Sequence, residues 1–79
     1  MILKVINIKG IIFEGEAKSI NLKTKAGEIT ILDNHRPLVA LLEKGEAKIK
    51  RVDGKEESVS INSGFLEMSP DNMLTLLID

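Results

Sequence analysis

Turn-forming residues recur along this chain at intervals of roughly 8 to 10 residues, and this spacing restricts the fold more than any other feature. The clearest turn signals are Lys25-Ala26-Gly27, Asp33-Asn34, Lys44-Gly45, Asp53-Gly54, Asn62-Ser63-Gly64 and Ser69-Pro70-Asp71-Asn72. Glycine permits positive φ, proline fixes φ, and Asp and Asn side chains hydrogen-bond the nearby backbone, so each group favours chain reversal. A 3.6-residue helical period has no room to develop between these turns. The spacing therefore predicts an all-β protein.

The segments between the turns carry the alternation of apolar and polar residues that is typical of strands. We expect strands in residues 1–9, 11–16, 17–24, 28–32, 37–43, 47–52, 55–61 and 65–68, with a last strand after Asn72. Short antiparallel strands at this spacing favour a sandwich of two antiparallel sheets with about nine to ten strands. No linker or repeat interrupts the chain, so residues 1–79 form one predicted domain.

Three residues have specific predicted roles in turns. Pro37 opens a strand, and it pushes the preceding Arg36 toward extended conformations. Asp53-Gly54 predicts a two-residue hairpin turn of type I′, which requires positive φ at both positions. Gly64 belongs to the turn before the next strand. Inside a predicted strand, Gly15 indicates a bulge or a close approach of another backbone.

Composition excludes several classes of function. Eleven Lys and Arg balance twelve Asp and Glu, with both signs mixed along the chain. This mixture provides no basic patch for nucleic acid or for an anionic membrane surface. The sequence has no cysteine and only two aromatic residues. No apolar run approaches the ~18 residues needed to cross a bilayer, and the first residues do not form a signal peptide. We expect no nucleic-acid partner and no direct insertion into a membrane.

The polar residues do not predict a catalytic or cofactor site. His35 is the only histidine, and Asp33 is the only acidic neighbour in its turn, so a metal site lacks ligands. Two interpretations of His35 stay open: its imidazole orders its own loop, or it contacts a partner protein. Paired carboxylates need a shared pocket, which a small filled sandwich rarely has. The glycines do not gather into a phosphate-binding loop. We expect no enzyme, no metal and no cofactor.

Apolar residues occur on nearly every predicted strand, and they also have two interpretations. They can all fill the space between the two sheets, or a surplus can remain outside for a permanent partner. Weak alternation in Ile11-Ile12, Leu38 to Leu42 and Leu74 to Ile78 favours the second interpretation.

Four segments, in order, resemble the N-terminal β-sandwich domain of the epsilon subunit of F-type ATP synthases. Residues 27–39 fit the family's G-E-x-x-I-L-x-x-H-x-P-L-V segment, and Ile12-Phe13-Glu14-Gly15-Glu16 fits its V-F-x-G-x segment. Residues 63–68 are similar to G-G-F-L-E-V, with Ser63 in place of the first glycine, and residues 72–79 match the strand that ends the domain. The order and spacing of the four segments make the resemblance specific.

The resemblance implies a non-catalytic subunit of the rotating central stalk. Such a subunit holds the gamma subunit, sits on the ring of c subunits and couples proton or sodium ion flow to ATP synthesis. It lies at the cytoplasmic face of the inner (plasma) membrane, as a peripheral part of the F1 sector. The turns implied to face the c ring contain Lys9, Gly10, Lys25, Ala26, Gly27, Glu28, Asp33, Asn34 and His35. There a carboxylate such as Glu28 can accept charge-assisted hydrogen bonds from the c-subunit loops.

One departure from the family limits the expected activity. Full-length members usually add a C-terminal pair of helices that can inhibit ATP hydrolysis and bind ATP, whereas this sequence ends at Asp79. We therefore expect neither inhibition by such a hairpin nor ATP binding. The competing hypothesis is a free-standing β-sandwich that serves as a protein-interaction or adhesion module.

Overall fold

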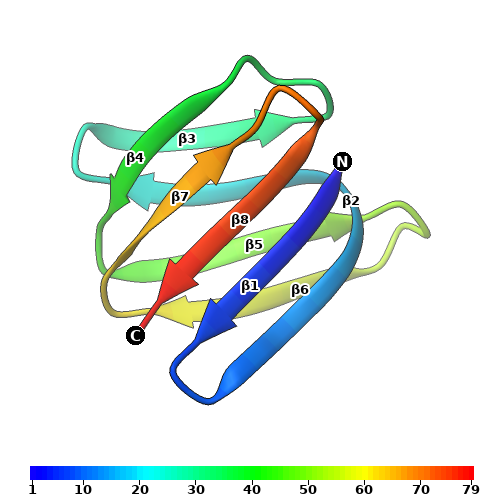
Figure 1. The fold of residues 1–79 in the computed structure, drawn as a ribbon. Helices are drawn as coiled ribbons and strands as arrows, with labels where there is room; N and C mark the ends of the chain where they lie inside the picture. Colours follow the sequence, from blue (N-terminus) through cyan, green and yellow to red (C-terminus); the bar gives the residue numbers. More distant parts are fainter.

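The computed structural model describes all residues from Met1 to Asp79 as eight strands without a helix (Figure 1). The strands are β1 (Ile2–Asn7), β2 (Gly10–Thr24), β3 (Gly27–Leu32), β4 (Leu38–Leu42), β5 (Gly45–Arg51), β6 (Glu56–Ile61), β7 (Gly64–Met68) and β8 (Met73–Ile78). The predicted all-β sandwich is thus confirmed, with eight strands where about nine to ten were expected. The difference arises mainly because residues 11–16 and 17–24 form a single long strand.

The strands lie in two layers that share β2 (Figure 1). In the front layer, β1 pairs with residues 10–16 of β2 and with β8, β8 pairs with β7, and β7 pairs with β4. In the back layer, the second part of β2 lies between β3 and β5, and β5 pairs with β6. Every neighbouring pair is antiparallel except β1 and β8, which are parallel. β3 and β6 are edge strands of the back layer.

β2 changes the side of the strand that faces the core as it passes from one layer to the other. Ala17 is buried in the first part, whereas Ile20 and Leu22 are buried in the second part. An irregularity in the pairing with β5, between Ala17 and Ser19, shifts the alternation by one residue. Because successive side chains point to opposite faces, this shift keeps an apolar row directed inward in both layers. The sequence pattern breaks at the same place, which explains why two strands were predicted.

The core between the layers consists of sixteen buried apolar residues. Its fully buried larger side chains include Leu3, Val5, Ile20, Leu22, Ile31, Leu42, Ile49, Leu66, Met68, Leu74 and Leu76. Thr24 is the one buried polar residue, and its hydroxyl is satisfied. Its Oγ1 donates to the Gly27 carbonyl at 2.7 Å and accepts from the Ala26 amide at 3.1 Å. The side chain therefore closes the β2–β3 turn from within.

The β5–β6 hairpin differs from the predicted type I′ turn. Gly54 has the expected positive φ of 90°, but Asp53 does not have a positive φ. The Gly54 amide donates to the Arg51 carbonyl at 3.0 Å, and the Arg51 amide donates to the Lys55 carbonyl at 2.8 Å. This pattern is a three-residue loop in which the glycine takes the left-handed position. The extra residue, Val52, moves Asp53 out of the left-handed region.

Two other glycines, Gly64 and Gly15, have surroundings that differ from those predicted from the sequence. Gly64 begins β7 with φ of 147°, and a Cβ added there would lie 2.1 Å from the Leu77 carbonyl oxygen. Position 64 therefore requires glycine, because the backbone of β8 approaches too closely for a Cβ. Gly15 lies near the ring of Phe13, and the pairing irregularity between β1 and β2 lies elsewhere: Val5 pairs with Phe13 and Ile6 with Ile11, which leaves Ile12 of β2 as the extra residue.

Candidate functional site

β3 separates two of the turns for which the family resemblance implies a partner contact. The turn with Lys25 and Ala26 precedes β3, and the loop with Asn34 and His35 follows it (Figure 1). Six residues of strand lie between them, about 20 Å of extended chain. Since β3 pairs only with β2, its other edge is free along this whole length. We call β3, β4 and these two turns the β3–β4 edge.

The turn before β3 is held firmly to the neighbouring β4. The Lys25 amide donates to the Leu41 carbonyl at 2.9 Å, and the Glu43 amide donates to the Lys23 carbonyl at 2.9 Å. The Lys25 ammonium lies 2.9 Å from Glu43 Oε1. This hydrogen bond to Lys25, together with its positive charge, lowers the pKa of Glu43 from its ordinary value. Backbone bonds and an exposed ion pair therefore fix the turn.

Glu28 lies exposed at the start of β3, on the side of the sheet that faces solvent. Asn21 on β2 donates its amide to Glu28 Oε2 at 3.1 Å. The same amide nitrogen lies 2.9 Å from Thr30 Oγ1 and 3.3 Å from the Ile29 carbonyl oxygen. The carboxylate has further lone pairs and no ion-pair partner, so it can accept hydrogen bonds from outside the chain.

The loop after β3 holds His35 by its backbone and leaves its ring exposed. The His35 amide donates to the Leu32 carbonyl at 3.1 Å. Nδ1 of its ring lies 2.8 Å from the Arg36 carbonyl oxygen, which can only accept, so Nδ1 donates its proton there. The ring thus contacts its own loop, and Nε2 stays available. Both interpretations of His35 keep a physical basis.

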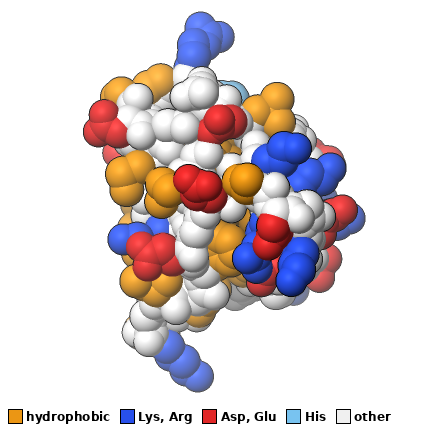
Figure 2. Space-filling model, turned by 90° about the vertical axis from the view of Figure 1, so that its right-hand side faces the viewer, with side chains coloured by type: hydrophobic (Ala, Val, Ile, Leu, Met, Phe, Trp, Pro, Cys, Tyr) orange, Lys and Arg blue, Asp and Glu red, His pale blue; other side chains and the backbone are white.

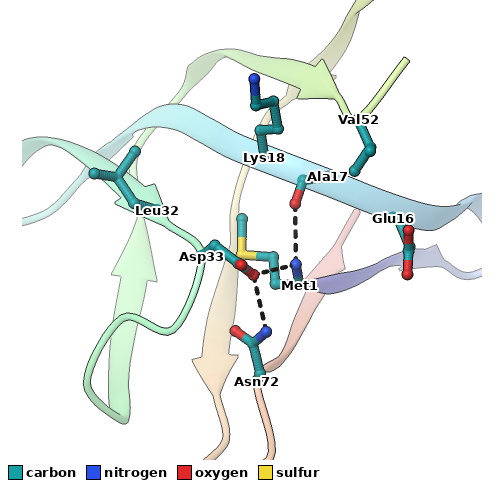
Figure 3. Close-up of a pocket in the computed structure, with 8 residues that line it drawn as sticks. All are labelled: Met1, Glu16, Ala17, Lys18, Leu32, Asp33, Val52 and Asn72. Atoms are coloured by element: carbon teal, nitrogen blue, oxygen red, sulfur yellow. Dashed lines mark hydrogen bonds and ion pairs between the residues drawn. The ribbon is translucent and has the colours of Figure 1, made fainter. Parts of the chain in front are cut away.

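A pocket of about 480 Å³ lies behind this loop, where β2 turns from one layer to the other (Figure 3). Its lining residues are Met1, Glu16, Ala17, Lys18, Leu32, Asp33, Val52 and Asn72. The Met1 ammonium donates to Asp33 Oδ1 at 2.5 Å and to the Ala17 carbonyl at 3.1 Å. Asn72 donates to the same Asp33 oxygen at 2.8 Å. These polar groups already satisfy one another, so the cluster acts as a structural clamp.

The electrostatics of the clamp follow from these contacts. The hydrogen bond from the ammonium, the hydrogen bond from Asn72 and the charge of the ammonium lower the pKa of Asp33 from its ordinary value. Asn72 also accepts from the Asn34 amide at 2.7 Å through Oδ1. Both asparagines have φ of 62°, a left-handed conformation that Asn tolerates better than most residues. The loop after β3 is therefore tied to the loop between β7 and β8.

The turn with Lys9 and Gly10 does not join the β3–β4 edge. It connects β1 to β2 at the end of the sandwich opposite the loop after β3 (Figure 1). Asn7 Oδ1 accepts from the Lys9 amide at 2.8 Å, and Gly10 has φ of 126°. Beside them Ile8 is 97% exposed. The nine residues assigned to one partner contact thus lie apart: residues 25–28 at the start of β3, residues 33–35 after its end, and Lys9 and Gly10 in the β1–β2 turn.

The two outer surfaces of the sandwich differ in chemical character. The sequence alone did not show which apolar residues face solvent. The outward side chains of the front layer include seven apolar residues: Ile2, Ile6, Val39, Leu41, Phe65, Met73 and Leu77. We call this surface the outer apolar face. Within it, Ile6, Leu77, Phe65 and Leu41 are successive cross-strand neighbours. Monomeric proteins rarely expose large contiguous apolar patches unless these bind something.

The outward row of the back layer is polar instead. Cross-strand neighbours there include Asn21, Lys48 and Ser58 in one row and Ser19, Lys50 and Glu56 in the next. Figure 2 shows the sandwich from the right-hand side of Figure 1, with basic side chains concentrated toward the right of the view and hydrophobic ones more frequent toward the left, where acidic side chains lie among them. The exposed apolar residues are therefore most numerous on the outer apolar face, and others lie outside it: Ile8, Ile11, Ile12, Leu32 and Val52.

The structure also shows what other sites the chain does not contain. No group of three His, Cys, Asp or Glu residues lies close enough to hold a metal ion. No helix long and apolar enough to cross a membrane is present. No buried side-chain polar atom lacks a hydrogen-bond partner.

Comparison with known proteins identifies a family with a β-sandwich domain. The family model described as the β-sandwich domain of the ATP synthase delta/epsilon chain matches residues 1–79. The chain belongs to this family.

Relatives with curated names point the same way. The chain is 43% identical over 75 residues to the ATP synthase epsilon chain of Bordetella petrii, covering 95% of this chain and 52% of that one. It is 36% identical over 77 residues to the ATP synthase epsilon chain of a Nitratiruptor species, covering 98% of this chain and 59% of that one. The chain therefore spans between half and three fifths of these relatives.

Solved structures share the fold. A chain in the mitochondrial ATP synthase of Euglena gracilis superposes with a TM-score of 0.91 at 23% identity, covering 99% of this chain and 49% of that one. A chain in the central stalk and c-ring structure of the Tetrahymena thermophila mitochondrial ATP synthase gives 0.80 at 18% identity, covering 99% and 62%. These likenesses show the fold of residues 1–79.

Proposed function

We propose that the chain is a non-catalytic epsilon subunit in the rotor, or central stalk, of an F-type ATP synthase. It links the gamma subunit to the c ring and couples proton or sodium ion flow to ATP synthesis. It is peripheral at the cytoplasmic face of the membrane, within the F1 sector. The observation that carries the proposal is the outer apolar face. A subunit that connects others needs a surface for a permanent partner, and an exposed apolar surface is of this kind because it is stabilised when a partner covers it.

The outer apolar face takes the gamma subunit. Permanent interfaces are richer in apolar residues than ordinary surface, and this face is the one side of the sandwich with such a composition. Leu41 is 63% exposed and Phe65 is 38% exposed, and the two are direct cross-strand neighbours. Covering them removes apolar area from water, which stabilises a complex by roughly 25 cal/mol per Å² before the costs of association.

The β3–β4 edge takes the polar loops of the c ring. Glu28 lies at the start of β3 and His35 in the loop after its end, so a partner that spans the length of β3 can reach both. The carboxylate of Glu28 and Nε2 of His35 supply hydrogen-bonding groups of the kind that recognise polar loops. Lys9 and Gly10 lie in the β1–β2 turn and contact the rotor by a separate surface.

The proposal is tested by assembly. The 79-residue chain is mixed with the gamma subunit and the c ring of the same source, and complexes are separated by size. A stalk complex that contains the chain is the expected result. A chain that stays alone at micromolar concentrations of all three partners would overturn the proposal and favour a free-standing interaction or adhesion module.

Substitutions at two exposed valines test whether the gamma subunit binds the outer apolar face. Val39 is 69% exposed within the outer apolar face, and Val52 is 54% exposed in the β5–β6 loop outside it. Val39→Ser combined with Leu41→Ser should weaken the affinity for gamma about tenfold or more, because central apolar contacts dominate interface energies. Val52→Ser should leave the affinity unchanged. Equal effects of the two changes would show that gamma binds another face.

A further inference from the structure

Glu67 is a charged residue inside the outer apolar face. It lies on β7 between Val39 of β4 and Thr75 of β8, its direct cross-strand neighbours. Two residues earlier on the same side of β7 is Phe65. The Glu67 side chain is exposed and takes part in none of the chain's five ion pairs. It also makes no side-chain hydrogen bond in the isolated chain.

The other charges near this surface are already compensated or lie at its rim. Lys4 and Glu14, on adjacent strands, form an ion pair at 3.5 Å. Thr75 of β8 lies between Glu67 of β7 and Lys4 of β1 in the same cross-strand row. The backbones of β7 and β1 are therefore about 10 Å apart. Lys4 therefore cannot neutralise both carboxylates at once. Among the outward side chains of β1, β8, β7 and β4, Glu67 is the one uncompensated charge.

A partner that covers this face buries the Glu67 carboxylate and must compensate its charge. Burying an ionised carboxylate without a counter-charge costs several kcal/mol, which would cancel much of the gain from the apolar contacts. A cationic side chain on the partner removes this cost and adds a charge-assisted hydrogen bond. We propose that Glu67 receives an Arg or Lys of the gamma subunit, and that this pair fixes the orientation of the sandwich on its partner.

This inference rests on the proposed function for the identity of the partner, and charge excludes the simplest alternative occupant. A second copy of the chain, packed face to face, would bring a second Glu67 to the interface. The one basic residue among the outward side chains of β1, β8, β7 and β4, Lys4, is already paired with Glu14. Two copies would thus bury two uncompensated carboxylates in an apolar surface. The charge pattern instead fits a partner with an apolar surface and a basic side chain near its centre.

The test compares Glu67→Gln and Glu67→Lys with the same changes at Glu46. Glu46 is an exposed glutamate on β5, outside the outer apolar face, with Ser60 as its cross-strand neighbour and no ion-pair partner. Affinity for the gamma subunit is measured by calorimetry or surface binding for all five chains, at low and at high salt. Thermal unfolding of each free chain is measured first. The melting temperatures should agree closely, since both glutamates are exposed.

Glu67→Gln should weaken binding to gamma about 30-fold, because losing one partner of a desolvated charged pair costs roughly 2 kcal/mol or more. Glu67→Lys should weaken it further, since two cations would then meet. Added salt should weaken the wild-type complex more than the Glu67→Gln complex. Both Glu46 variants should bind like the wild type.

Each result has a separate meaning. If the wild type binds gamma and Glu67→Gln binds within about twofold of it, the pairing of Glu67 is refuted while the proposed function stands. If the wild type does not bind gamma at all, the proposed function fails, and the inference fails with it. Formation of a dimer by the free chain through this face would also refute the pairing.

Discussion

The side-chain amide of Asn72 donates to Oδ1 of Asp33 at 2.8 Å, which joins two loops that are 39 residues apart in the sequence. The other end of the same amide accepts from the Asn34 backbone at 2.7 Å. One side chain therefore carries both hydrogen bonds between the loop after β3 and the β7–β8 loop. This contact determines how the part of the β3–β4 edge that holds His35 sits on the sandwich.

Asn72→Ala should lower the free energy of unfolding by about 1 to 3 kcal/mol. The change removes two hydrogen bonds and places a residue with a Cβ but no local polar group in a left-handed conformation. Urea unfolding of the two chains measures the difference. Asn72→Gly, which accepts φ of 62° but lacks the amide, isolates the hydrogen-bond contribution. An unchanged midpoint for Asn72→Ala would show that the two loops are held by packing alone.

Asp33 should make the chain less stable in acid. Its pKa is lower in the folded chain than its ordinary value of 3.8, so it stabilises the folded state above the pKa of the unfolded chain. That contribution disappears as the pH falls through the lowered pKa of the folded chain. Glu43, whose pKa is lowered by Lys25, has the same sign. Melting temperatures from neutral pH to about pH 2 should show the wild type losing its advantage over Asp33→Asn below about pH 4. A constant difference between them would contradict this linkage.

Gly64→Ala should be severely destabilising, by roughly 3 kcal/mol or more, a range reached mainly by overpacking, burial defects or backbone strain. The new Cβ would lie 2.1 Å from the Leu77 carbonyl oxygen and 2.9 Å from Ile78 Cα. Both obstacles are backbone atoms, so β7 and β8 must separate. Gly10→Ala is the control, because it combines a positive φ of 126° with open space. A smaller loss for Gly64→Ala than for Gly10→Ala would mean that β8 can move aside without cost.

Gly54→Ala should cost about 1 kcal/mol or more, since its φ of 90° is strained for a residue with a Cβ. Nothing lies within 4 Å of the added atom, so the loss reports the backbone conformation alone. Gly54→Asn should recover part of it, because Asn tolerates the left-handed region. Thermal unfolding is a sufficient measurement. Equal stability of the glycine and alanine chains would exclude the three-residue loop.

Glu28→Ala and His35→Ala should separate folding from assembly. Both side chains are exposed, so each change should alter the stability of the free chain by less than about 0.5 kcal/mol. The loss should appear in association with the gamma and c-ring assembly, at about 2 to 5 kcal/mol for a desolvated charged hydrogen bond. A large fall in melting temperature with unchanged association would assign His35 to loop ordering only.

Local patterns predicted the strands well because both faces of each strand have distinct surroundings. Leu3 and Val5 alternate with outward residues as expected, and so do Ala47 and Ile49. Ile61, at the end of the predicted strand 55–61, also lies inward. In these strands the hydrophobic period and the turn residues give the same answer, so local sequence is sufficient.

Long-range relationships were not accessible to the same reasoning. The parallel pairing of β1 with β8 joins the two ends of the chain, and no local signal specifies it. The contact between Asn72 and Asp33 likewise depends on which loops the topology brings together. For the interaction surfaces, Glu28 and His35 were singled out by the resemblance to the epsilon family, and their contact with a partner stays a prediction. Glu67 was not singled out from the sequence, since an outward glutamate in a strand resembles any other until the apolar character of its neighbours is known.

The change of side in β2 has a mechanical consequence. This strand is hydrogen-bonded to β1, β3, β4 and β5, so the two layers share a covalent backbone as well as an apolar contact. A twisting force applied to the front layer reaches the back layer through peptide bonds, which do not slip as packed side chains can. The amides at the centre of β2 should therefore exchange with deuterium only when the whole domain opens. A body built in this way turns as one piece.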